Sequence, residues 1–160
     1  EKAFVQTPIG WMELQASLEG LTSVKRVEGP IKPGPIYNDL LQRAKKQLEA
    51  YFAGELKRFN LPLDWSGAPA FNRSVWEIVK EIPYGHTTTY SAIAEQLENP
   101  KAVRAVGLAN KYNPIAIIVP CHRVIAKNGD LQGYFYGLDI KRQLLELENP
   151  MAFARQGSLF

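Results

Sequence analysis

A single cysteine followed by a histidine is the first place in this chain where chemistry could occur. Cys121 is the only cysteine, and His122, in the stretch VPCHRV, is one of two histidines. A cysteine becomes a nucleophile as its thiolate, and a nearby base that takes the thiol proton activates it. Free cysteine is also among the most buried residue types, so a structural core residue is the alternative. The stretch alone favours the core alternative.

The histidine needs a group that orients it, and Glu148 near the end of the sequence is a candidate. A carboxylate that accepts from one imidazole nitrogen fixes the tautomer of the ring. Successive side chains of an extended segment point to opposite faces, so we expect a water molecule between Cys121 and His122 instead of direct contact. The other histidine, His86 in PYGHTTTY, is predicted to lie in a surface turn, with a role in the site as the alternative.

The composition indicates a folded protein that works in a reducing compartment. The chain has 160 residues, of which 46% are hydrophobic and 22% charged, which argues against disorder. The net charge of +3 permits a polyanionic partner without requiring one. One cysteine allows neither an internal disulfide nor a Cys/His zinc cluster, so we expect no metal. We expect no signal peptide, and because no apolar run reaches about 18 residues, we also expect no membrane span.

The first half of the sequence predicts strands followed by one helix. Apolar alternation over residues 4–27 is broken at two glycines and predicts strands and hairpins. A helix capped by Asn38 should follow, because apolar residues then recur at helical spacing up to Phe52. Residues 59–70 predict a short strand and a linker, with a domain boundary near residues 66–69.

The second half predicts a helix-turn-helix. Residues 72–82 fit a helix that stops at Pro83. Two short helices, capped by Thr89 and Asn99, are then separated by about three residues, as in a helix-turn-helix. The second of them is rich in small residues around Arg104, which fits tight helix packing or close approach to nucleic acid.

Two further elements would position the cysteine and the glutamate. Residues 113–120 predict a turn and then a buried apolar strand that leads to Cys121. Residues 138–148 predict a closing helix that ends at Glu148.

Several segments together resemble a known family. In order and spacing, IPYGHTTTY, NPKAVRAVGLANKYNP, PCHRV and KRQLLELE are similar to the O6-alkylguanine-DNA alkyltransferases, also called methylated-DNA–protein-cysteine methyltransferases. The resemblance is dense over residues 71–148 and weaker in the first half, where TPIGWMEL and LQRAKKQLEAYFAGE carry it. PCHRV together with RAVG and the terminal glutamate makes a highly specific combination.

The resemblance implies a fold and a DNA-binding surface. It implies an α/β N-terminal domain, a ribonuclease-H-like sheet plus helix, over residues 1–66. A mainly α domain with the helix-turn-helix follows over residues 67–150, and then a tail over residues 151–160. The recognition helix would enter the narrow minor groove, which suits its small residues. The implied DNA contacts are Tyr90, Ser91, Asn99, Arg104, Ala105 and Lys127, although Lys127 departs from the small polar residue often found there.

The resemblance also implies a reaction. Arg104 would replace the extruded base in the stack, and Tyr90 would help rotate the nucleotide out. Cys121 would attack the alkyl carbon on O6 of the flipped guanine, with His122 as general base through water and Glu148 orienting it. The Tyr90 hydroxyl would protonate N3 of the leaving guanine. A thioether on the cysteine would remain, so each molecule reacts once. The implied substrate pocket consists of Asn113, Val124, Tyr134, Phe135 and Tyr136.

The partner implied is double-stranded DNA that carries O6-alkylguanine, with O4-alkylthymine as a second substrate left open. We expect a monomer without cofactor, in the cytoplasm and, in a prokaryote, associated with the nucleoid. Phe135 and Tyr136 depart from the serine and glycine of many family members. Two aromatic rings there should narrow the alkyl pocket, so that methyl is accepted better than benzyl. The alternative is that both rings turn outward.

Three rival functions differ in what happens at the cysteine. An alkyltransferase-like protein that only flags lesions typically lacks the cysteine, which this chain keeps at Cys121. A plain helix-turn-helix regulator would not need Glu148 and Tyr90 at the family spacing. A thiol hydrolase would react many times, whereas a transferase whose cysteine becomes a thioether would react once.

Overall fold

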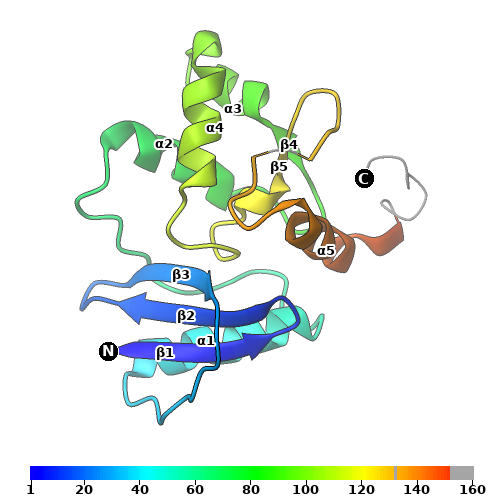
Figure 1. The fold of residues 1–160 in the computed structure, drawn as a ribbon. Coiled ribbons are helices and arrows are strands. Elements are labelled where there is room, and N and C mark those ends of the chain that lie inside the picture. The colour runs from blue at the N-terminus through cyan, green and yellow to red at the C-terminus, as the bar shows by residue number, and fades with distance from the viewer. Residues whose placement is uncertain (132, 152–160) are drawn as a thin grey trace. The chain divides into compact units, whose positions relative to one another are not determined.

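The structure, a computed structural model, describes residues 1–131 and 133–151 and divides into two units (Figure 1). The first unit contains Glu1–Ser66 together with Pro114–Ile118, and the second contains Gly67–Asn113 and the chain from Val119 onward. The predicted tail lies outside the described residues from position 152 on. No helix in the described part of the chain is long and apolar enough to cross a membrane.

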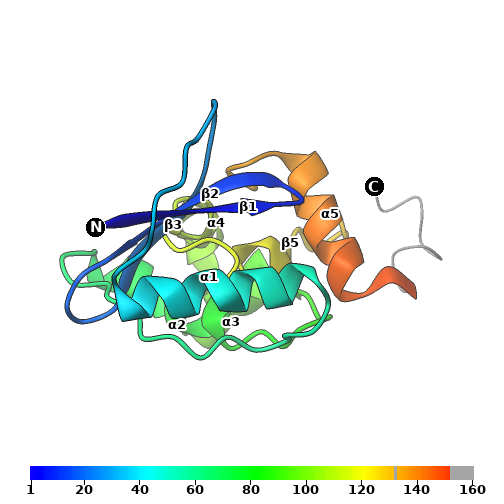
Figure 2. The same cartoon turned by 90° about the horizontal axis from the view of Figure 1, so that it is seen from below.

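The first unit is a three-stranded antiparallel sheet with one helix. The strands lie in the order β1-β2-β3, and α1 packs against β1 and β2 (Figure 2). Buried side chains of the sheet and of α1, among them Met12 and Leu48, form its core. As predicted, the Asn38 side chain caps the helix by accepting from the N–H of Leu41 at 3.0 Å. The elements are β1 (Lys2–Thr7), β2 (Gly10–Ala16), β3 (Leu21–Val27) and α1 (Asp39–Phe52).

Two strands predicted from apolar runs are absent from the described residues. In residues 113–120, Ile115 forms an isolated bridge to Val24 in β3, and Ala116 and Val119 are likewise bridge residues outside any strand. In residues 59–70, only Leu63 forms a bridge, to Leu21. A run of apolar residues shows that a segment is buried, but it cannot separate a strand from buried irregular chain. The prediction that an apolar strand leads to the cysteine is therefore wrong.

The second unit is mainly helical and carries one short parallel strand pair, β4 with β5 (Figure 1). Its α4 packs against both α2 and α3. The helices are α2 (Ala70–Lys80), α3 (Tyr90–Gln96), α4 (Val103–Lys111) and α5 (Leu138–Glu148). The remaining elements are the strands β4 (Thr88–Thr89) and β5 (Val124–Ile125) and the 3-10 turns η1 (Pro100–Ala102) and η2 (Cys121–Arg123).

The predicted helix-turn-helix corresponds to α3 and α4, with one correction at the start of the second helix. Thr89 caps α3 as predicted, since its hydroxyl accepts from the N–H of Ala92 at 3.0 Å. Asn99, by contrast, makes no side-chain capping bond, and the turn after it is the 3-10 turn η1. The helix predicted at residues 72–82 runs from Ala70 to Lys80, because the chain tightens into a turn before Pro83.

Candidate active site

Cys121 begins the 3-10 turn η2 and is almost completely buried, with 4% of its surface exposed. Two asparagines at the end of α4 hold this turn. The Asn113 amide donates to the carbonyl of Val119 at 2.9 Å and to the Cys121 Sγ at 3.3 Å. The Asn110 amide donates to the carbonyl of Cys121 at 3.1 Å. The predicted recognition helix and the cysteine are therefore joined by direct hydrogen bonds.

The side chains of Cys121 and His122 diverge for a different reason from the one the sequence suggested. The segment is not extended, and a 3-10 turn with three residues per turn rotates neighbouring side chains by about 120°. His122 Nε2 lies 2.6 Å from Glu148 Oε2, whereas His122 Nδ1 has no hydrogen-bond partner among the described residues. No direct bond joins the imidazole to the thiol, and Nδ1 remains available.

Glu148 lies at the centre of a buried charge cluster. Arg123 donates to both of its carboxylate oxygens, at 2.8 and 3.0 Å, and also donates to the carbonyl of Ile82 at 2.7 Å. Burial opposes ionisation of Glu148, but hydrogen bonds from His122 and Arg123 and the charge of Arg123 outweigh it and lower the pKa to about 2. The carboxylate is therefore ionised at neutral pH.

The histidine beside it is held neutral. Burial lowers the pKa of His122, and although Glu148 acts in the opposite direction, the net shift is downward. The neutral ring keeps its proton on Nε2, where the N–H donates a hydrogen bond to the carboxylate. Nδ1 therefore carries a lone pair. This is the protonation state that a general base requires.

Lys141 is a buried cation that sequence reasoning missed. Its Nζ donates to the carbonyl of Val124 at 2.6 Å, and none of its surface is exposed. Burial lowers the pKa of Lys141 to about 8, opposed by the charge of Cys121. Burial raises the pKa of the Cys121 thiol, while the Asn113 hydrogen bond and the Lys141 charge lower it. The ammonium group therefore favours the thiolate.

A signal for Lys141 did exist in the sequence. It shares the buried face of α5 with Leu144, Leu145 and Glu148, at the i, i+3, i+4, i+7 spacing of a helix stripe. A lysine on a buried stripe is either paired or functional, because Lys is almost never fully buried without a partner.

Replacing Lys141 with methionine should slow the reaction of Cys121 with a small thiol reagent about tenfold at pH 7. Loss of a nearby cation raises the thiol pKa by roughly one unit or more, which reduces the thiolate fraction. The pH profile of the reaction with iodoacetamide measures this, and it should move to higher pH. Lys80→Met, at the exposed end of α2, is the control and should leave the profile unchanged. An unchanged profile in Lys141→Met would contradict the role of its charge.

Two tyrosines supply hydroxyl groups near the cysteine. Burial, followed by the charge of Cys121, raises the pKa of Tyr90 to about 12. The same causes raise the pKa of Tyr134 well above its usual range, and its hydroxyl has no partner among the described residues. Gly133 leaves room for Tyr90, since a Cβ at that glycine would lie 3.1 Å from the Tyr90 Oη. Both hydroxyls are protonated at neutral pH and able to donate.

The other residues named from the sequence fall into two groups. Val124 is buried in β5 next to η2, Tyr136 is half-buried, and Phe135 is exposed. Ser91 is half-buried at the start of α3, where its hydroxyl lies 3.2 Å from that of Thr89. The implied DNA contacts that are exposed are Asn99, Arg104, Ala105 and Lys127.

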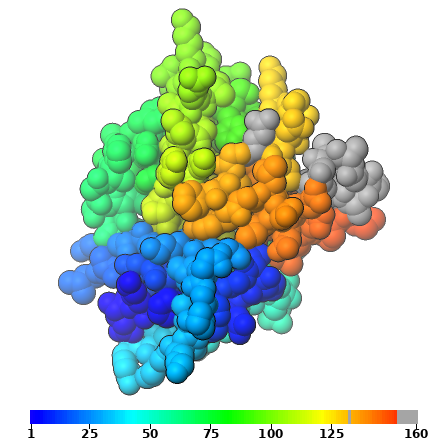
Figure 3. All heavy atoms as spheres, in the orientation of Figure 1, coloured from blue at the N-terminus to red at the C-terminus, as the bar shows by residue number. Residues whose placement is uncertain are grey.

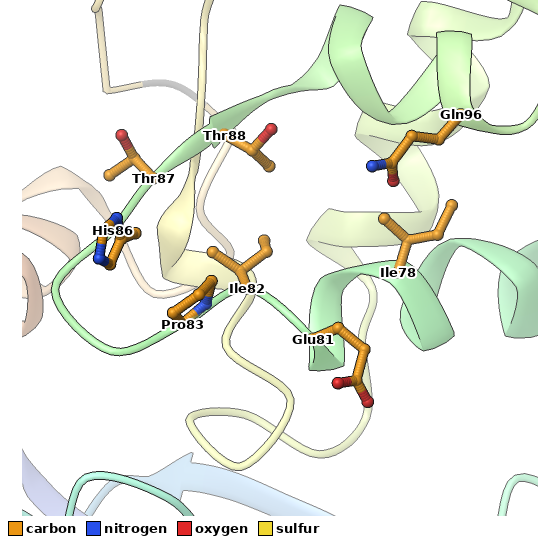
Figure 4. A pocket seen from close by; sticks show the side chains of 8 residues that line it. All are labelled: Ile78, Glu81, Ile82, Pro83, His86, Thr87, Thr88 and Gln96. Atoms are coloured by element: carbon orange, nitrogen blue, oxygen red, sulfur yellow. The ribbon is translucent and has the colours of Figure 1, made fainter.

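A hollow of about 410 Å³ lies elsewhere in the second unit, and no cysteine lines it. His86 lies exposed in a turn at its edge, as predicted, with Thr87 and Thr88 beside it (Figure 4). The hollow meets the buried charge cluster only at Ile82, whose carbonyl accepts from Arg123. Among residues 1–131 and 133–151, no group of three or more His, Cys, Asp or Glu side chains could hold a metal ion.

Comparison with known proteins identifies the family. Residues 2–65 match the ribonuclease-like domain of 6-O-methylguanine DNA methyltransferase, and residues 70–150 match its DNA binding domain. A methylated-DNA–protein-cysteine methyltransferase of Methanosarcina acetivorans is 53% identical over 151 residues, covering 91% of this chain and 96% of that protein.

Solved structures agree with this assignment. The crystal structure of Mycobacterium tuberculosis OGT in complex with DNA matches with a TM-score of 0.81 and 45% identity, over 92% of this chain and 91% of that one. An O6-methylguanine DNA methyltransferase from Methanococcus jannaschii matches with a TM-score of 0.64 and 33% identity, over 92% and 89% of the two chains. The chain belongs to the 6-O-methylguanine DNA methyltransferase family.

Proposed function

We propose that this protein repairs DNA by transferring the alkyl group of O6-alkylguanine to its own Cys121. The observation that carries the proposal is the buried arrangement of a cysteine, a neutral histidine with an available Nδ1, and an ionised glutamate. The family assignment and the name of the Methanosarcina relative support the same reaction.

In the proposed mechanism, His122 Nδ1 removes the Cys121 proton through a water molecule. The imidazolium that forms is stabilised by Glu148, 2.6 Å from Nε2, which remains a carboxylate because its pKa is about 2. Lys141 favours the thiolate by its charge. The positions of Glu148 and Lys141 on one helix face let α5 present both charges to the cysteine turn.

The transfer step is a nucleophilic displacement at the alkyl carbon. The bond from the Cys121 sulfur to that carbon forms as the bond from the carbon to O6 breaks, and the electron pair stays with guanine. Tyr90, whose pKa is about 12, supplies its hydroxyl proton to N3 of the leaving guanine. The product is a thioether, which water does not cleave under ordinary conditions. Each protein molecule therefore reacts once.

The proposed DNA surface lies on the helix-turn-helix of the second unit. Arg104 and Ala105 are exposed on α4, and Asn99 is exposed just before it. We assign Arg104 to the place of the extruded base, and Tyr90 and Ser91 to the adjacent backbone. Exposed Lys127 would contact a phosphate. The DNA complex of the M. tuberculosis protein supports double-stranded DNA as the partner.

The proposed function also indicates how the chain is divided into domains and where in the cell the protein works. We divide the chain into an N-terminal α/β domain at residues 1–66, a DNA-binding and alkyl-transfer domain at residues 67–150, and a tail. We also place the protein in the cytoplasm, near the nucleoid of a prokaryote, because its substrate is chromosomal DNA.

Arg104→Ala tests the DNA-dependent half of the proposal. Its rate of methyl transfer from duplex DNA should fall tenfold or more, because extruding a base costs roughly a few kcal/mol. Its rate with free O6-benzylguanine should not change, because a free base needs no extrusion. Lys101→Ala, one helical turn earlier and also exposed, is the control for lost positive charge. An equal fall with both substrates would mean that Arg104 acts on the fold or on the cysteine.

A further inference from the structure

Four aromatic rings form a continuous row that runs from the buried Tyr134 to the surface. Tyr134 and Tyr136 have ring centroids 5.7 Å apart, and Tyr136 and Phe135 are 5.1 Å apart. Phe135 then meets Tyr112, at the end of α4, at 5.9 Å and an interplanar angle of 69°. All three contacts are edge-to-face, a favourable geometry for aromatic pairs.

The inner end of this row is the buried ring of Tyr134. Tyr134 is buried, and the charge of Cys121 acts on its hydroxyl. Gly133, one residue earlier, faces the hydroxyl of Tyr90. We call residues 133–137 the pocket segment. Because Gly133 faces Tyr90 and Tyr134 is buried, we assign this segment to the wall of the proposed substrate pocket.

The outer end of the row is a contact between two exposed rings. Phe135 and Tyr112 are each 56% exposed, and the Lys111 Nζ lies 5.7 Å from the Tyr112 ring centroid. In Figure 3, orange spheres of the chain after Gly133 lie at the surface next to the yellow-green end of α4. Phe135 and Tyr112 are 23 positions apart in the sequence, yet their rings touch. Because both rings remain exposed, this contact contributes little to the core.

The pocket segment has a glycine at each end. Gly133 and Gly137, at its two ends, both have positive φ, at 72° and 97°. A positive φ is readily adopted by glycine, so the chain can pivot at both positions. A turn bond from the Gly137 N–H to the carbonyl of Tyr134, at 3.1 Å, joins the middle of the segment to its end. The Phe135–Tyr112 contact joins the segment to the residue that follows α4.

We propose that Tyr112 and Phe135 form a latch that holds the pocket segment closed and restricts the reaction to small alkyl groups. This inference rests on the proposed function. Methyl fits with the latch closed, whereas a benzyl-sized group requires the segment to swing out and the two rings to separate. Because Tyr112 follows the DNA-binding helix, the size limit depends on a residue outside the pocket itself.

Removing either ring should therefore relax the size limit. The measured quantity is the ratio of the rate with O6-benzylguanine to the rate with O6-methylguanine, each in the same duplex sequence. Using one duplex cancels any effect of Tyr112 on DNA binding. An edge-to-face pair opposes opening by about two- to tenfold, so Phe135→Ala and Tyr112→Ala should each raise the ratio by that factor.

The double variant shows whether the two rings act together as a latch or limit the pocket separately by their size. If the two rings act as one contact, Phe135→Ala combined with Tyr112→Ala should raise the ratio no further than the larger single effect. Tyr37→Ala, which removes an exposed ring in the first unit, is the control and should leave the ratio unchanged.

Two outcomes would overturn the latch. In one, Tyr112→Ala leaves the ratio unchanged while Phe135→Ala raises it, which would mean that only ring bulk limits the pocket. In the other, the double variant shows the product of the two single effects, which would mean that the rings act independently. Failure of the proposed function looks different, because the unaltered protein would then transfer no methyl group at all.

Discussion

Cys121→Ala is expected to abolish alkyl transfer and to leave DNA binding intact. The thiol is the only cysteine sulfur in the chain, so no other group of that kind can take its place. The proposed DNA contacts on α3 and α4 do not include it. Transfer of a labelled methyl group from duplex DNA should be undetectable, whereas the dissociation constant, measured by fluorescence anisotropy, should stay within about threefold of the original.

The control for this variant is a similar truncation that spares the thiol. Val79→Ala removes buried atoms from α2 in the same unit and should lower stability by about 1–3 kcal/mol while transfer continues. If Cys121→Ala lost DNA binding together with transfer, the cysteine would be a core residue that maintains the binding surface, and its assignment as nucleophile would be contradicted.

Glu148→Gln should be the most damaging conservative change in the second unit. A neutral amide cannot balance the buried Arg123 guanidinium, which now donates to both carboxylate oxygens, nor can it stabilise a His122 cation. Breaking one side of a buried ion pair costs about 3–5 kcal/mol, and we expect that loss in urea denaturation at pH 7. Methyl transfer should also slow, by about 100-fold, because general-base catalysis depends on the oriented imidazole.

The pH dependence of the unfolding free energy tests whether the Glu148 carboxylate is the cause of the stability loss in Glu148→Gln. The pKa of Glu148 falls from 4.5 to about 2 on folding, so its contribution is present above pH 4.5 and is lost as the pH falls toward 2. The contribution is on the order of 3 kcal/mol. The difference in unfolding free energy between the original protein and Glu148→Gln should therefore shrink between pH 5 and pH 3. Glu146→Gln, exposed on the same helix, should match the original protein throughout, and a constant difference for Glu148→Gln would contradict the account.

Local signals in the sequence were sufficient for much of the fold. The capping side chains of Asn38 and Thr89 mark where α1 and α3 begin, because a cap is a contact within three residues. The order of strands and helices follows from apolar periodicity in the same way. Asn99 is the exception, since the proline after it begins a 3-10 turn in which the asparagine side chain makes no capping bond.

Features that depend on distant parts of the chain could not be predicted in this way. The apolar residues before Cys121 suggested a strand, but β3 offers them only one bridge, and the cysteine itself lies in a 3-10 turn. The buried partners of Arg123 and Lys141 could not be predicted, because nothing local shows that Glu148 and the carbonyl of Val124 will meet them in the interior. The Tyr112–Phe135 contact likewise joins residues far apart in the sequence.

The most direct test of the account is the mass of the intact protein after mixing with excess duplex DNA containing O6-methylguanine. We expect a gain of one methyl group per molecule, carried by the peptide that contains Cys121, together with restored guanine in the DNA. A second addition of substrate should produce no further reaction. An unchanged protein mass, whether with DNA merely bound or with repair that continues through many turnovers, would contradict it.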